Sequence, residues 1–263
     1  MNRNRKLLYV IIIFFLAFTI SADKVEGREK EPIIVAAAAS LRFALPDIVQ
    51  EFEKSTGIKV IISYGSSGMF AQQIENGAPF DLFASANIAY LERLKKQGLI
   101  DGSIQTYALG RLVLVVNKES AVNISNLKGL LNPEVRKVAI ANPNHAPYGL
   151  AAKEALVKSG LWQKLSAKIV YGENARQTLQ FIQTGNVEAG IVALSIANVP
   201  QISYIMIDKA LHSPLEQALA VIKDSKNKED ARAFIAYINS PKGQAIMIKY
   251  GFLPDGESFD TRP

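Results

Sequence analysis

Short apolar runs alternate with apolar positions at helical spacing along most of the chain. The first such run, residues 33–39, stops at Ser40 and is followed by Leu45, Ile48, Val49 and Phe52. This pattern predicts a buried parallel strand that leads into a helix. Ser40 then lies at the start of the helix, where unpaired backbone N–H groups can bind an anion. The alternative is that Ser40 only caps the helix.

Two similar units follow. The strand predicted at 58–63 runs through Gly65, Ser66, Ser67 and Gly68 into a helix, and a strand and turn at 81–87 precede another helix. Three strand-to-helix units in succession favour a parallel, doubly wound sheet. Ser67 repeats the position of Ser40.

The second half of the chain predicts another sheet of the same kind. A strand at 111–117 follows no helix, so we expect the chain to cross into a second lobe near 106–110. Further strands are expected at 138–142, 168–171 and 189–193, each next to helical spacing. From about residue 199 we expect the chain to return, with strands at 202–207 and 217–222 and helices at 230–238 and 242–250.

The predicted fold class is therefore α/β, with two lobes that are each a doubly wound, mainly parallel sheet. Lobe I comprises residues 31–108 and 200–263, and lobe II comprises 109–199. Hinges are expected near 106–110 and 195–201, and a cleft between the lobes.

The N-terminus has the anatomy of a signal peptide. Arg3, Arg5 and Lys6 precede an apolar run at 7–20, which is short for a membrane-spanning helix and ends in small residues. We assign residues 1–27 to a signal peptide and expect export to the periplasm; an uncleaved anchor is the alternative. The sequence has no cysteine, which excludes a lipid-modified cysteine and disulfides.

Charge and composition exclude several kinds of partner. The formal charge of the 263 residues is +6, and half of it comes from residues 1–22, which hold Arg3, Arg5 and Lys6 and no acidic residue. No stripe of Lys and Arg with interleaved aromatics is present, so we expect no nucleic-acid partner. Two isolated histidines and scattered carboxylates predict no protein-coordinated metal ion.

Ligands of open α/β sheets bind outside the carboxyl ends of the strands. The turns at those ends contain Ser40, Ser67, and the segments 147–149 and 174–176, two from each lobe. Their donors are hydroxyls and backbone N–H groups, which suit a fully deprotonated tetrahedral oxyanion. A ligand that must itself donate a hydrogen bond would leave a mismatched buried pair, at a cost of about 1–3 kcal/mol.

The chain resembles the periplasmic molybdate-binding proteins that serve ABC importers. The matching motifs are VAAAASL (35–41), YGSSG (64–68), GAPFDLFASA (77–86), GRLVL (110–114), ANPNHAPYG (141–149), GIVALS (190–195) and YGF (250–252). The resemblance implies a type II periplasmic-binding-protein fold, no catalysis and no cofactor. It further implies that molybdate, often tungstate as well, is delivered to a membrane permease, and we expect a monomer.

The family's ligand-binding serines fall on Ser40 and Ser67, and its helix-start amides on Tyr148 and Ala175. Some members have a tyrosine hydroxyl where this chain has Ala193, so either fewer donors suffice or another group, such as the Tyr148 hydroxyl, compensates.

Two other functions remain open at this stage. One is a receptor for sulfate or another tetrahedral oxyanion. The other is an exported serine hydrolase that uses Ser67, with His145 or His212 as its base, although the chain has no G-x-S-x-G motif.

Overall fold

The structure is a computed structural model that describes residues 31–120 and 122–254, so the predicted signal peptide lies outside the described residues. The described residues belong to one compact unit that begins at Glu31. Within these residues, no helix is long and apolar enough to cross a bilayer.

The first sheet has five strands in the order β2-β1-β3-β10-β4. Their bounds are β1 (Ile33–Ala38), β2 (Val60–Gly65), β3 (Leu82–Ser85), β4 (Ile100–Gly110) and β10 (Leu215–Ile222). β1 pairs in parallel with β2 and β3, whereas β10 is antiparallel to both β3 and β4.

The second sheet also has five strands, in the order β7-β6-β8-β5-β9. Their bounds are β5 (Leu112–Asn117), β6 (Val138–Ala141), β7 (Ile169–Gly172), β8 (Ala189–Ala193) and β9 (Ile202–Met206). β6 pairs in parallel with β7 and β8, and β5 is antiparallel to β8 and β9. The two α/β lobes are confirmed, but both sheets are mixed rather than mainly parallel.

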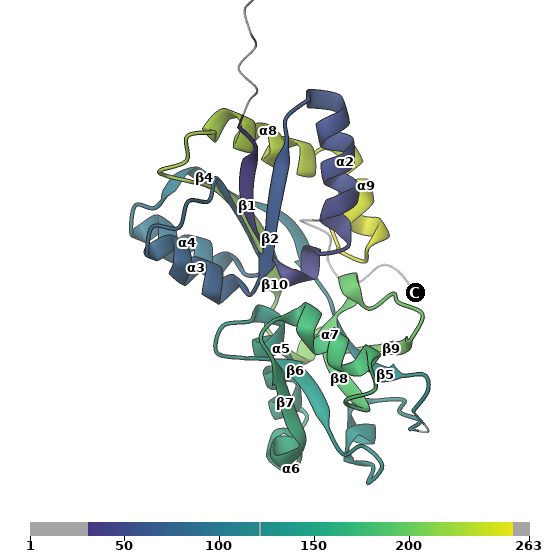
Figure 1. Ribbon diagram of the computed structural model, residues 1–263. Coiled ribbons are helices and arrows are strands. Elements are labelled where there is room, and N and C mark those ends of the chain that lie inside the picture. Colours follow the sequence, from purple (N-terminus) through teal and green to yellow (C-terminus); the bar gives the residue numbers. More distant parts are fainter. Residues whose placement is uncertain (1–30, 121, 255–263) are drawn as a thin grey trace, which may run out of the picture. The chain divides into compact units, whose positions relative to one another are not determined.

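Helices flank both sheets (Figure 1). The α-helices are α2 (Ala44–Thr56), α3 (Ser67–Glu75), α4 (Ile88–Lys96), α5 (Pro147–Lys158), α6 (Trp162–Leu165), α7 (Ala175–Gln183), α8 (Lys228–Ile238) and α9 (Pro241–Lys249). Short 3-10 turns are η1 (Ala39–Leu41), η2 (Leu127–Leu131), η3 (Ser166–Lys168), η4 (Leu194–Ile196) and η5 (Lys209–Leu211).

The cores follow this layering. On the first sheet, α2, α8 and α9 share one apolar cluster, and α3 and α4 share another with the opposite face. A third cluster joins the second sheet to α5 and α7. α2 illustrates the sequence logic, because Leu45, Ile48 and Phe52 are buried as predicted and Gly57, at φ 72°, ends the helix in the left-handed region.

One strand was missed and one connection was predicted wrongly, whereas the first crossing lies close to the predicted 106–110. Residues 100–110 form the long strand β4, which was missed because polar residues and Gly102 dilute its apolar pattern, as suits a sheet edge. The strand expected to return at 202–207 is β9, which pairs with β5 in the second sheet instead. The chain therefore crosses between the sheets at 110–112 and returns at 207–214, later than the predicted hinge at 195–201.

Candidate functional site

One small cavity contains all four residues that the sequence predicts as ligand contacts. It is lined by Ala38, Ala39, Ser40, Gly65, Ser66, Ser67, Ala86, Ala146, Pro147, Tyr148, Asn174 and Ala175. Its empty volume, part of which is open to solvent, is about 220 Å³, below the roughly 300–1,000 Å³ of pockets for drug-sized ligands. The cavity therefore suits a small ion rather than a peptide.

Ser40 has an unsatisfied side chain in this cavity. It follows β1 within the turn η1 and is 1% exposed. Its Oγ is buried and makes no hydrogen bond of normal geometry among the described residues, although the Tyr148 hydroxyl lies next to it. A buried polar group without a partner costs about 1–3 kcal/mol, so the hydroxyl is suited to a ligand that accepts its proton.

Ser67 begins α3 and is fully buried. Its Oγ accepts a hydrogen bond of 3.0 Å from the backbone N–H of Ala86, at the end of β3. Because the hydroxyl oxygen already accepts one proton, its own proton remains available for donation. Ser67, which lines the cavity, can therefore donate to a ligand.

Tyr148 and Ala175 lie in the first turns of α5 and α7, where backbone N–H groups have no partner within the helix. In α7, the side chain of Asn174 accepts from the N–H groups of Arg176 at 3.0 Å and Gln177 at 3.1 Å. This cap leaves the N–H of Ala175 for a ligand. The positive ends of α3, α5 and α7 thus meet at the cavity.

None of the described residues that line the cavity carries a formal charge. Burial raises the pKa of the Tyr148 hydroxyl well above its ordinary value, so the wall stays neutral at physiological pH. An anion in the cavity would be held by helix dipoles and hydrogen bonds rather than by a cationic side chain.

The Tyr148 hydroxyl has a partner of its own. Its oxygen accepts a hydrogen bond of 2.8 Å from Gln217 Nε2, and Gln217 in turn accepts one of 2.9 Å from the hydroxyl of Tyr107. Ala193, where some relatives of the predicted family carry a tyrosine, does not line the cavity. Whether the Tyr148 hydroxyl replaces that donor stays a prediction.

The sequence analysis missed two residues that organise the site. Ala86 orients Ser67, and Ser195 Oγ donates a 2.8 Å hydrogen bond to the backbone oxygen of Ser40. Asn174 was predicted as part of the segment 174–176, but its role as the cap of α7 was not. The signal for Asn174 is local, since Asn before a helical pattern is a common N-cap. Ser195 and Ala86 meet their partners through tertiary structure and carry no local signal.

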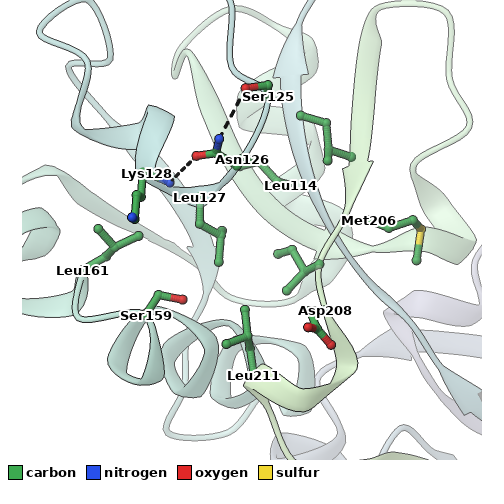
Figure 2. A pocket seen from close by; sticks show the side chains of 12 residues that line it. Leu114, Ser125, Asn126, Leu127, Lys128, Ser159, Leu161, Met206, Asp208 and Leu211 are labelled. Atoms are coloured by element: carbon green, nitrogen blue, oxygen red, sulfur yellow. Dashed lines mark hydrogen bonds between the residues drawn. The ribbon is translucent and has the colours of Figure 1, made fainter.

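A larger pocket in the second lobe differs from this cavity in the residues that line it (Figure 2). Its walls are mostly apolar and include Leu114, Leu127, Leu161, Met206 and Leu211, together with the carboxylate of Asp208. Asp208 and Lys128 both line it, so their charges offset each other, and the helix N-termini described above do not contribute to its walls. Among the described residues, no group of three or more potential metal ligands is found.

Comparison with known proteins decides the family. A model of the family described as "Bacterial extracellular solute-binding protein" matches residues 33–253 of the chain. The chain belongs to this family. Within it, Molybdate-binding protein ModA of Azotobacter vinelandii is 38% identical over 231 residues, which are 83% of this chain and 88% of that protein.

One further relative and one solved structure agree with this assignment. The putative ABC transporter substrate-binding lipoprotein YvgL of Bacillus subtilis is 36% identical over 86% of this chain and 88% of its own length. The solved structure of the periplasmic molybdate-binding protein of Azotobacter vinelandii matches with a TM-score of 0.79 and 34% identity, over 84% of this chain and 98% of that one. The predicted resemblance and the two-lobed α/β fold of periplasmic binding proteins are confirmed.

Proposed function

We propose that this chain is an extracytoplasmic receptor that captures molybdate and delivers it to an ABC-type importer in the membrane. The names of the relatives support this ligand and this partner. The observation that carries the proposal is the buried Ser40 hydroxyl, which makes no hydrogen bond of normal geometry among the described residues and shares a small uncharged cavity with Ser67, Tyr148 and Ala175.

The donor set favours a dianion without a proton. Hydroxyls and backbone N–H groups each contribute about 1.5–3 kcal/mol when they bind a charged acceptor. Several of them, after ordering and desolvation costs, reach the ~8 kcal/mol of a micromolar complex. Tungstate presents the same four oxygens as molybdate, so we propose that it binds as well, and sulfate is the competing ligand.

The two chain crossings supply hinges for closure on the ligand. Residues 31–110 with 215–254 form one lobe by sheet membership, and residues 111–214 form the other. Ser40 and Ser67 come from the first lobe, and Tyr148 and Ala175 from the second. An anion that bonds to all four favours the closed state, because only that state brings both sets of donors to it.

The same arrangement argues against a serine hydrolase. His145 Nδ1 lies 2.8 Å from Ser66 Oγ, and its Nε2 lies 3.6 Å from a carboxylate oxygen of Glu173. However, the Ser66 hydroxyl donates to the backbone oxygen of His145, so its proton is engaged by a carbonyl group. The Ser67 hydroxyl, which the alternative function would use, has its hydrogen bond with the N–H of Ala86 and not with a histidine. We therefore propose that the protein is not an enzyme. We also propose that it acts as a monomer in the periplasm.

A competition titration tests the proposal. Isothermal calorimetry of the mature protein with molybdate, tungstate, sulfate and phosphate should give tight binding for the first two and phosphate weakest. The double variant S40A/S67A should bind molybdate at least about tenfold more weakly, because two charge-assisted hydrogen bonds are lost.

Ser166→Ala is the matched control, since it removes an exposed hydroxyl that bonds only to the backbone oxygen of Gln163 at 2.9 Å. Unchanged affinity in S40A/S67A would exclude this site. Preference for sulfate over molybdate would assign the chain to the competing ligand, and turnover of ester or phosphoester substrates would overturn the non-enzymatic function.

A further inference from the structure

The loop before α5 in the second lobe is fastened to the first turn of α3 in the first lobe. The backbone oxygen of His145 accepts a hydrogen bond of 2.9 Å from the N–H of Gly68. The same oxygen accepts a second hydrogen bond from the Ser66 hydroxyl, 79 residues away in the sequence. His145 Nδ1 completes the contact at 2.8 Å from Ser66 Oγ.

Gly68 is required for this close approach. A Cβ atom at position 68 would lie 2.7 Å from the backbone oxygen of His145 and 2.9 Å from its Cα. Both are backbone atoms, which cannot move away as the end of a flexible side chain could. Any residue larger than glycine would therefore keep the His145 loop away from α3.

Three consecutive residues, 66–68, have different roles in these contacts. Ser67 faces the cavity with a hydroxyl already oriented by Ala86. Ser66 and Gly68, on either side of it, both bond to His145. The N–H of Gly68 is one of the first-turn donors without a partner in its own helix, so the second lobe satisfies a donor that the ligand does not use.

We propose that Ser66, Gly68 and His145 form a clasp that holds the two lobes closed over the bound anion and slows its release. The clasp joins the two lobes beside the cavity, where Ser66 and Ala146, the neighbour of His145, both contribute to the wall. It rests on the proposed function, because its effect is on the residence time of the captured oxyanion. Its contacts exist only when the lobes meet, so it acts on dissociation more than on first encounter.

The test compares three variants of the mature protein by the rate at which radiolabelled molybdate leaves into excess unlabelled molybdate. Ser66→Ala loses the hydroxyl that bonds to His145 and should release molybdate about tenfold faster. His145→Ala keeps the backbone oxygen and loses only the ring contact, so about a threefold acceleration is expected. Ser166→Ala, which removes a hydroxyl-to-carbonyl bond within one lobe, should behave as wild type.

Gly68→Ala should weaken molybdate binding at least about a hundredfold, because packed backbone does not yield to the added methyl group. Alanine is a better helix former than glycine, so a thermal unfolding temperature in the absence of ligand that is equal to or above that of wild type separates this effect from misfolding. The chain has no cysteine, so spin labels at Lys96→Cys and Lys164→Cys report the distance between lobes directly.

Molybdate should shorten the distance between the labels in wild type and leave it long in the Gly68→Ala background. Wild-type release rates in Ser66→Ala and His145→Ala, together with a wild-type label distance in Gly68→Ala, would overturn the clasp, and the proposed function would still stand if the wild-type protein binds molybdate. A wild-type protein that binds no oxyanion would overturn the proposed function, and with it the role of the clasp in retention.

Discussion

Two buried sites built for negative charge lie at opposite ends of the parallel strands β1 and β3. Asp81, directly before β3, is 6% exposed, and its carboxylate accepts from the backbone N–H of Ile34 at 2.7 Å and from the Ser225 hydroxyl at 2.6 Å. The amide of Asn227 adds longer contacts of 3.3 and 3.4 Å. At the carboxyl ends of the same strands lies the cavity with Ser40 and Ser67.

The donors at the two ends are of the same chemical kind, namely backbone N–H groups and neutral side chains. At the amino end, the chain supplies its own anion, and its hydrogen bonds join β1, β3 and the start of α8. At the carboxyl end, the Ser40 hydroxyl makes no hydrogen bond of normal geometry among the described residues. Neutral donors suffice for a buried carboxylate, which supports the same chemistry for a small oxyanion.

The largest effect that we expect is on the free energy of unfolding and comes from removing the Asp81 carboxylate. Asp81→Ala leaves the N–H of Ile34 and the hydroxyl of Ser225 unsatisfied and should lower the free energy of unfolding by about 3 kcal/mol. Urea denaturation measures this loss, and calorimetry should find the molybdate affinity of the folded variant close to wild type. A large loss of molybdate affinity in Asp81→Ala, with the unfolding free energy unchanged, would contradict the view that the Asp81 site is structural and the cavity binds the ligand.

Ser40→Ala and Ser67→Ala should separate ligand binding from stability. Each removes one donor to the anion, so each should weaken molybdate binding by about 1.5–3 kcal/mol. Ser40→Ala should change the unfolding free energy by less than about 1 kcal/mol, because the hydroxyl makes no hydrogen bond of normal geometry within the fold. Ser67→Ala leaves the N–H of Ala86 without its acceptor and should lower the unfolding free energy by about 1 kcal/mol. Equal changes of unfolding free energy in the two variants would contradict this difference between the serines.

Alkaline pH tests whether the cavity wall stays neutral. Burial raises the pKa values of Tyr107 and Tyr148 above the ordinary value and that of Tyr64 to about 12. Above pH 10 the unfolded chain therefore binds fewer protons than the folded one, and stability falls as pH rises. Tyr148→Phe should make the fall between pH 10 and 11 shallower by about 1 kcal/mol, as measured by urea unfolding at each pH.

The smallest effect is expected from the cap of α7. Asn174→Ala frees the N–H groups of Arg176 and Gln177 next to the cavity, so it should lower stability by about 1 kcal/mol and weaken molybdate binding a few-fold. Asn126→Ala removes a similar cap, bonded to the N–H of Lys128 at 3.0 Å, far from the cavity lining. Asn126→Ala should lower the unfolding free energy without changing the affinity for molybdate. Equal molybdate affinities in Asn174→Ala and Asn126→Ala would exclude a role for the α7 cap in binding.

Much of the fold follows from local sequence patterns. The apolar run before Ser40, the small residues around Ser67 and the helical spacing after each predicted where strands become helices, because those periods reflect backbone geometry alone. The edge strands were harder. β4 was missed and β9 was assigned to the wrong lobe, since an edge strand buries little and its choice of sheet depends on which neighbouring edge is free.

The sequence pattern placed Ser40 and Ser67 where strands become helices, because strand ends and helix starts are local features, and the family resemblance assigned Tyr148 and Ala175 to helix starts. Only the tertiary structure decided that these four starts meet in one cavity, that the Ser40 hydroxyl makes no hydrogen bond of normal geometry there, and that Ser66 and Gly68 bond to His145. Such contacts join residues far apart in the chain. They depend on how two independently formed sheets approach each other, and no local period of the sequence encodes that approach.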